Sequence, residues 1–73
     1  MKKKQIPSEM FGERLRAARR MAGLTQEKVA EHIRVDRTTY SKYEAGRVKP
    51  SLHAAYQLAE LLRVTLDELL KPE

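Results

Sequence analysis

The 73-residue sequence contains no cysteine, so disulfide bonds cannot supplement its hydrophobic core. Histidine, aspartate and glutamate form no cluster at metal-ligand spacing, and we therefore expect neither a metal nor another cofactor. There is no long apolar run, and the three lysines near the N-terminus are not followed by the apolar segment of a signal peptide. These absences predict a cytoplasmic protein without a membrane span.

Two further shortages narrow the possible functions. No nucleophile stands beside a general base and no glycine-rich loop would cradle a phosphate, so we expect no enzyme. With one phenylalanine, three tyrosines and no tryptophan, the chain also lacks the aromatic side chains on which single-stranded RNA bases stack. A binding function is therefore the expectation, with RNA recognition by a basic helical domain as a less favoured alternative.

What the sequence does contain is unevenly placed positive charge. Fifteen lysines and arginines stand against ten aspartates and glutamates, a formal net charge of +5. Residues 1–49 carry a net +7 and residues 50–73 a net −2. This asymmetry favours an anionic partner on the basic side, with nucleic acid as the leading candidate, although charge alone fits a solubilising surface equally well.

The spacing of apolar residues predicts helices along nearly the whole chain and no strand. Capping residues divide it into five short helices, after a basic segment (residues 1–7) that we expect to be a flexible arm. The helices are expected from Ser8 to about Met21, from Thr25, from Asp36 to Gly46, from Ser51 or its neighbour, and from Thr65, where Glu68 completes a capping box. The expected inward-facing residues of the first four are Phe11, Leu15, Ala18, Ala22, Val29, Ala30, Ile33, Tyr40, Tyr43, Leu52, Ala55, Leu58, Ala59 and Leu62.

The second and third helices are separated only by Arg34 and Val35, so they must turn sharply against each other. Ala30 is small where the second helix needs a close approach, and Tyr40 and Tyr43 give the third helix a core side. This is the arrangement of a helix-turn-helix, here at about residues 25–45. In that motif the second helix of the pair is held out from the body so that it can enter a DNA major groove.

Four segments resemble, in order and spacing, the Cro and phage-repressor type of helix-turn-helix domain, a prokaryotic regulator family. They are "FGERLRAARRMAGLTQEKVA", "DRTTYSKYEAG", "KPSLHAAYQLAELL" and "VTLDELL". The resemblance implies a compact, all-α, five-helix lambda-repressor-like domain over residues 8–73. It also implies a nucleoid-associated transcriptional regulator that binds double-stranded operator DNA as a homodimer, such as a phage or plasmid repressor or a restriction-modification controller.

The side of the third helix opposite Tyr40 and Tyr43 carries the candidate base readers, which are Arg37, Thr38, Ser41 and Lys42. Arginine and lysine can pair with guanine O6 and N7, and threonine offers a hydroxyl or a methyl contact. Threonines are poor helix formers with no packing reason to stand here. The resemblance implies base reading by Arg37, Thr38 and Lys42, whereas Ser41 fits a solvated surface equally well.

Phosphate contacts are expected from Gln26 of the second helix, Thr39 of the third, and Arg47 and Lys49 in the loop that follows. Gln26 opens the second helix, and the resemblance implies that its amide binds a phosphate oxygen together with backbone N–H groups. For Arg47 and Lys49 a solvated loop is an equal alternative. The arm lysines 2–4 either wrap the duplex or, as we favour, keep the protein soluble.

The family pattern also bears on one ion pair within the protein and on three positions at which this sequence departs from its relatives. The resemblance implies a partly buried ion pair between Arg19 and Glu44. Relatives often carry glycine where this chain has Arg34 and Arg63, so both arginines are expected in a left-handed conformation at about 1 kcal/mol each. Ala45 replaces a side chain that often contacts the DNA backbone.

Apolar residues of the last two helices bear on how the protein assembles. Leu66, Leu69 and Leu70, with Tyr56 and Leu61, can form a small symmetric dimer interface, although Leu66 and Leu69 fit the monomer core better. An antitoxin-like or adaptor protein that binds a protein partner is the alternative function, and an exposed apolar patch would favour it. His32 and His53 are expected on the surface.

Overall fold

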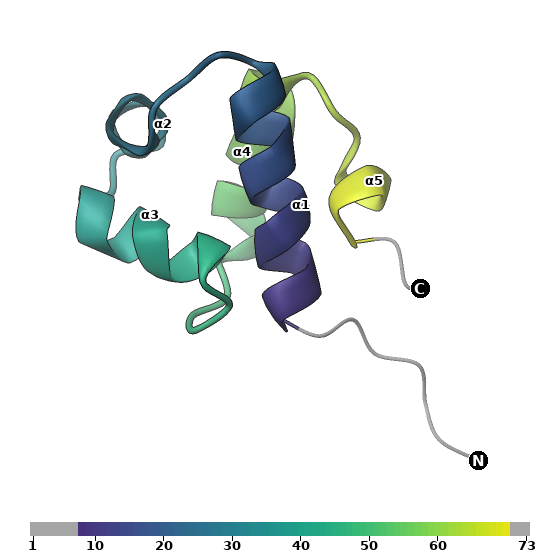
Figure 1. Cartoon of the computed structure of the whole chain (residues 1–73), viewed down its shortest axis with the longest axis horizontal. Coiled ribbons are helices and arrows are strands. Elements are labelled where there is room, and N and C mark those ends of the chain that lie inside the picture. The colour runs from purple at the N-terminus through teal and green to yellow at the C-terminus, as the bar shows by residue number, and fades with distance from the viewer. Residues whose placement is uncertain (1–7, 71–73) are drawn as a thin grey trace.

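The computed structural model describes residues 8–70, which form five helices: α1 (Ser8–Met21), α2 (Gln26–His32), α3 (Arg37–Glu44), α4 (Leu52–Leu62) and α5 (Leu66–Leu70). The predictions of an all-α fold and of five helices are confirmed. In Figure 1, α2 and α3 lie on one side of α1, and α5 lies on the other. Within residues 8–70 no helix is both long and apolar enough to traverse a bilayer. The arm, residues 1–7, lies outside the described residues.

Each helix contributes to a single hydrophobic core. Its largest fully buried side chains are Leu15 of α1, Val29 of α2, Tyr40 of α3, Leu58 of α4 and Leu69 of α5. Removing these apolar surfaces from water is the main force that holds the short helices together, since none is long enough to be stable alone.

Two residues that the sequence places in the core lie outside it. Leu52 is 67% exposed because it is the first residue of α4, two residues before the buried part of that helix begins at Ala54 and Ala55. Ala22 is exposed because α1 ends at Met21 and the chain has already entered the turn. In both cases the helical spacing continues beyond the point where neighbouring elements cover it.

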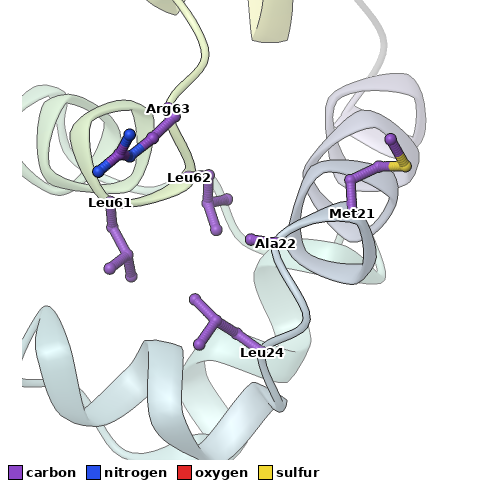
Figure 2. A pocket seen from close by; sticks show the side chains of 6 residues that line it. All are labelled: Met21, Ala22, Leu24, Leu61, Leu62 and Arg63. Atoms are coloured by element: carbon purple, nitrogen blue, oxygen red, sulfur yellow. The ribbon is translucent and has the colours of Figure 1, made fainter.

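A pocket of about 330 Å³ opens where the C-terminal ends of α1 and α4 meet. Figure 2 shows Leu24 and Leu61 pointing toward it, whereas Met21 points outward and is 88% exposed. The half-buried Leu61 therefore lines this pocket rather than the outer side of α4. No lining residue comes from α2 or α3, so the pocket is separate from the helix-turn-helix.

The helix starts follow the capping residues in the sequence. The side-chain oxygens of Thr25, Asp36 and Ser51 each accept a hydrogen bond from the backbone N–H three residues on. Thr65 and Glu68 form the predicted capping box: the Thr65 N–H donates to Glu68 Oε1 at 2.8 Å, and the Glu68 N–H donates to Thr65 Oγ1 at 3.0 Å.

The ends of α1 to α4 also follow one pattern, in which the first or second residue after the helix adopts a left-handed conformation. Gly23 and Gly46 do so with φ of 72° and 76°, and Arg34 and Arg63 with φ of 62° and 59°. The next N–H then reaches back to close the turn, as Val35 does to the Ala30 carbonyl at 3.0 Å. The left-handed prediction for both arginines is confirmed.

Arg34→Gly should therefore stabilise the protein. A left-handed residue with a Cβ carries a steric cost that glycine avoids, so the free energy of unfolding should rise by about 1 kcal/mol. In a domain of this size the melting temperature would rise by about 4–8 °C. Thermal melting checks this, with Arg34→Ala as the matched control that retains the Cβ. An equal rise in both variants would point to loss of charge instead.

Gly12 marks the closest approach of two helices. A Cβ built on this residue would lie 2.2 Å from the Glu44 carbonyl oxygen and 2.9 Å from that of Tyr43. The middle of α1 thus touches the C-terminal end of α3 backbone to backbone. Arg16 and Arg19 follow Gly12 by four and seven residues on the same face of α1, and this spacing directs both arginines at Glu44.

Candidate nucleic-acid interface

The exposed face of α3 is entirely polar. Arg37, Thr38 and Lys42 are exposed and Ser41 is half-buried, while Tyr40, Tyr43 and Glu44 turn inward. The two tyrosine rings pack edge to face, with centroids 6.1 Å apart, and anchor the helix to the body. The four candidate base readers therefore share one outward face of α3.

The candidate phosphate-contacting residues surround that face. Gln26 is the first residue of α2 and is half-buried, and Arg47 and Lys49 are exposed in the loop after α3. The backbone N–H of Thr39 donates to the Asp36 carboxylate at 2.7 Å, and the Thr39 side chain also hydrogen-bonds that carboxylate, so a phosphate contact from Thr39 would have to replace one of these bonds. The arm lysines lie outside the described residues.

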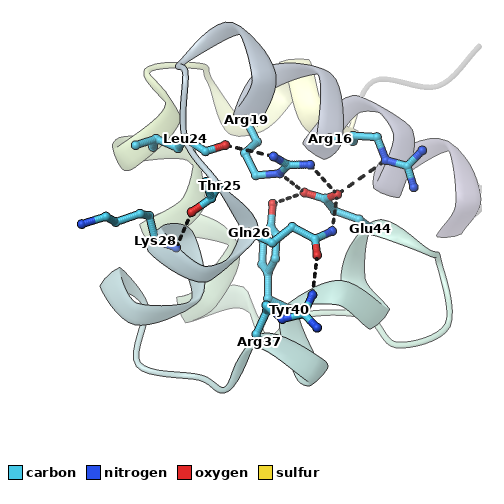
Figure 3. Close-up of polar contacts among 9 residues, drawn as sticks. All are labelled: Arg16, Arg19, Leu24, Thr25, Gln26, Lys28, Arg37, Tyr40 and Glu44. Atoms are coloured by element: carbon cyan, nitrogen blue, oxygen red, sulfur yellow. Dashed lines mark hydrogen bonds and ion pairs between the residues drawn. The ribbon is translucent and has the colours of Figure 1, made fainter.

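Glu44 is the centre of a buried polar cluster beneath the interface (Figure 3). Arg19 donates from Nε to Glu44 Oε2 at 2.7 Å and from Nη2 to Oε1 at 3.3 Å. Its third contact, from Nη1 to the Leu24 carbonyl at 2.9 Å, ties the turn before α2 to the same guanidinium. Arg16, half exposed, approaches Glu44 Oε1 at 3.5 Å. The ion pair thereby holds α1, the turn and α3 in one arrangement.

The hydroxyl of Tyr40 in α3 belongs to this cluster. Tyr40 donates to Glu44 Oε2 at 2.5 Å, in the interior of the protein, and its hydroxyl does not reach the surface. Burial, followed by the hydrogen bond to the Glu44 carboxylate, raises the pKa of Tyr40 well above its usual range. Tyr40 is therefore a neutral donor at all physiological pH values.

Gln26 connects the cluster to the surface. Its Nε2 donates to Glu44 Oε1 at 2.9 Å, and its Oε1 accepts from Arg37 Nη1 at 3.3 Å. The side chain of a candidate base reader is thus joined, through one amide, to a buried carboxylate. Sequence reasoning missed this link because no short-range pattern relates residues 26, 37 and 44.

The charge of Glu44 makes stability depend on pH. Burial would raise the pKa of Glu44, but hydrogen bonds from Arg19, Tyr40 and Gln26 together outweigh burial and lower it below the ordinary value of 4.5. The ordinary value is also the pKa of Glu44 in the unfolded chain. At pH values above it, the charged carboxylate contributes its full stabilisation. This contribution is lost as the pH falls through the lower pKa of the folded protein.

Glu44 should therefore add no pH dependence to the melting temperature between pH 7 and about pH 5, and should make it fall increasingly steeply at lower pH. Asp36 acts in the same direction, since its hydrogen bonds to Thr39 lower its pKa too. Melting curves from pH 7 to pH 3 test this. Glu44→Gln should flatten the acid limb, whereas Glu60→Gln, an exposed site on α4, should leave it as steep as in the wild type.

Comparison with known proteins shows to which family this arrangement of helices belongs. A family model described as helix-turn-helix matches residues 15–69, most of the chain. The chain belongs to the helix-turn-helix family. It is 40% identical over 62 residues to the HTH-type transcriptional regulator YonR, derived from prophage SPβ of Bacillus subtilis, a match that covers 85% of this chain and 57% of YonR. The chain spans about half the length of several such relatives.

Solved structures of this helix-turn-helix family superpose on the chain. The restriction-modification controller protein C.AhdI from Aeromonas hydrophila is 35% identical, with a TM-score of 0.80, covering 86% of this chain and 96% of that one. The P22 c2 repressor, solved in complex with a synthetic operator, is 27% identical with a TM-score of 0.80, covering 85% and 94%. The resemblance to the repressor type of domain is confirmed in fold and in family.

Proposed function

We propose that this chain is a sequence-specific DNA-binding transcriptional regulator, acting as a repressor, that reads the major groove with α3. The observation that carries the proposal is the polar outward face of α3, held on a helix-turn-helix whose inner face is packed into the core. An α-helix fits the major groove, and its N-terminal residues meet the base edges. The operator complex of the P22 c2 repressor supports the same use of this fold.

Arg37, Thr38 and Lys42 are the proposed base readers, with Ser41 as a further contact. Arg37 is the first residue of α3 and is exposed, so its guanidinium can form the bidentate pair with guanine O6 and N7. Lys42 lies five residues further along α3, where it can reach acceptors on the adjacent bases. Thr38 supplies a hydroxyl or a methyl contact to thymine.

The proposed phosphate contacts are Gln26, Thr39, Arg47 and Lys49. The Gln26 amide donates one of its two N–H groups to Glu44, and the second can donate to a phosphate oxygen. Arg47 and Lys49 carry exposed charge along the loop that follows α3. Such contacts fix the register of the protein on the duplex but do not discriminate sequences.

We further propose that the regulator binds as a homodimer, because two half-sites multiply both affinity and specificity. Leu69 is 1% exposed and belongs to the monomer core, and Leu66 is half-buried. The apolar side chains left for an interface are Tyr56 of α4, 57% exposed, and Leu70 of α5, 38% exposed. We propose that a second copy packs against these side chains of α4 and α5.

Selection of bound sites from a random duplex DNA pool tests the function directly. At near-physiological salt, which suppresses non-specific phosphate binding, we expect enrichment of an inverted repeat with half-sites about 10 base pairs apart. A single half-site would refute the dimer only, and no enrichment from folded protein would refute sequence-specific binding.

Arg37→Ala should separate reading from anchoring. We expect a loss of about 1 to 3 kcal/mol on the selected site and a relaxed preference at one base pair. Lys49→Ala removes the same charge from the loop and should weaken all sequences alike. Competition binding to the selected site and its single-base variants measures both. An unchanged preference in Arg37→Ala would remove Arg37 from the readers.

Binding to a protein partner, with DNA binding secondary, is the second candidate function. The observation in its favour is the strongly exposed Met21 beside the pocket between α1 and α4, which no residue of α2 or α3 lines. A folded protein that enriches no DNA sequence would favour this function over the first.

A further inference from the structure

The buried carboxylate of Glu44 controls more than the packing of α1 against α3. Three donors converge on it from the interior side: Arg19 Nε and the Tyr40 hydroxyl meet Oε2, and Arg19 Nη2 meets Oε1. With these groups the carboxylate is 3% exposed, so it cannot touch DNA. Arg16 of α1 approaches Oε1 at 3.5 Å, and the Gln26 amide of α2 donates to the same oxygen at 2.9 Å.

The charge of Glu44 dictates which way the Gln26 amide faces. A carboxylate only accepts hydrogen bonds, so Gln26 must present its Nε2 to Glu44. Its Oε1 is then turned outward, where it accepts from Arg37 Nη1 at 3.3 Å (Figure 3). If the amide were turned over, its NH₂ would face the guanidinium, donor against donor, and Arg37 could not stay there.

We propose that Glu44 is a positioning residue for base reading: through the Gln26 amide it holds the guanidinium of Arg37 in place at the N-terminus of α3. The inference rests on the proposed function, in which Arg37 reads a base. Holding the guanidinium before DNA arrives reduces the conformational entropy lost on binding, and this gain is realised only at the base pair that Arg37 contacts. Glu44 thereby affects sequence preference without contacting the nucleic acid.

The discriminating experiment exchanges the carboxylate of Glu44 and the amide of Gln26, first at residue 44 alone and then at both residues. In Glu44→Gln, the new amide oxygen stays with Arg19 Nε and the Tyr40 hydroxyl, so its NH₂ faces Gln26 and the Gln26 amide turns over. We expect the preference at the Arg37 base pair to fall about two- to tenfold, the worth of one hydrogen bond. Adding Gln26→Glu supplies acceptors to both neighbours at once, and the double variant should regain the preference.

Each of these variants has a control. Glu60→Gln changes the net charge equally on the exposed face of α4 and should leave the preference unchanged. Melting curves establish that each variant is folded at the assay temperature. Should Glu44→Gln fail to fold, Gln26→Met breaks the link at a half-buried site and leaves the Arg19 and Tyr40 contacts intact. It should lower the same preference about two- to tenfold.

The outcomes distinguish the inference from the function on which it rests. If Arg37→Ala alters the preference but folded Glu44→Gln, or Gln26→Met in its place, does not, the inference is wrong and the function stands. A double variant no better than Glu44→Gln also overturns the inference. If Arg37→Ala itself leaves the preference unchanged, Arg37 is not a reader, and the proposed role of Glu44 falls with it.

Discussion

Glu44→Ala should lower the free energy of unfolding by about 3 to 5 kcal/mol, which is a large share of the total for a domain of this size. The carboxylate is buried and is the shared acceptor of Arg19, Tyr40 and Gln26. Its removal leaves a guanidinium, a hydroxyl and an amide without their acceptor in a space that water enters poorly. The cost of stranding a buried charge exceeds what the pair contributed to stability.

Denaturant unfolding at neutral pH measures the loss. Glu60→Ala removes the same charge from an exposed position of α4 and should change stability by no more than about 0.5 kcal/mol. A melting temperature of Glu44→Ala close to that of the wild type would show that the cluster relaxes or hydrates, and would contradict the assigned role of the ion pair.

Gly12→Ala should also be strongly destabilising, by about 3 kcal/mol. Helix propensity alone predicts the opposite, a gain of about 1 kcal/mol when alanine replaces glycine inside a helix. The structure reverses the sign because the new Cβ would meet the backbone of Glu44 at 2.2 Å, and backbone cannot move aside as a flexible side chain can. Helices α1 and α3 would have to separate, weakening the contacts between Arg19 and Glu44.

The exposed residue Ala17 lies in the same helix and provides the control. Ala17→Gly measures the propensity effect by itself and should cost about 1 kcal/mol. Denaturant unfolding of the two variants gives both values. Stabilisation by Gly12→Ala would mean that the close approach of the two helices is not required for the fold.

Much of the fold is predictable from short-range patterns. Thr25, Asp36, Ser51 and Thr65 mark helix starts because a short polar side chain can satisfy the free N–H groups that follow it. Arg34 and Arg63 mark two helix ends at which the resemblance implies a left-handed residue. The predictions for Leu52 and Ala22 fail because periodicity identifies a helix face but not how far the neighbouring elements cover it.

The candidate interface also has features that the sequence predicts and features that only the structure reveals. The sequence places Arg37, Thr38, Ser41 and Lys42 on the outer face of α3, since the inner face is defined by Tyr40 and Tyr43, and their base contacts remain to be tested. For Gln26 it predicts only a phosphate contact. The structure adds the hydrogen bonds of Gln26 to Glu44 and Arg37, partners that are 18 and 11 residues away in the chain.

The sequence by itself determined the number of helices, their caps, the position of the helix-turn-helix and the polar face of α3. Each of these depends on interactions within a few residues or on one helical repeat, and such interactions can be recognised in the order of the amino acids. Only the tertiary structure decided that Gly12 is a contact point, that the Tyr40 hydroxyl is buried, and that Glu44 is joined to Arg37 through Gln26. These features arise where α1, α2 and α3 converge, and the distance between side chains there depends on how the whole core packs.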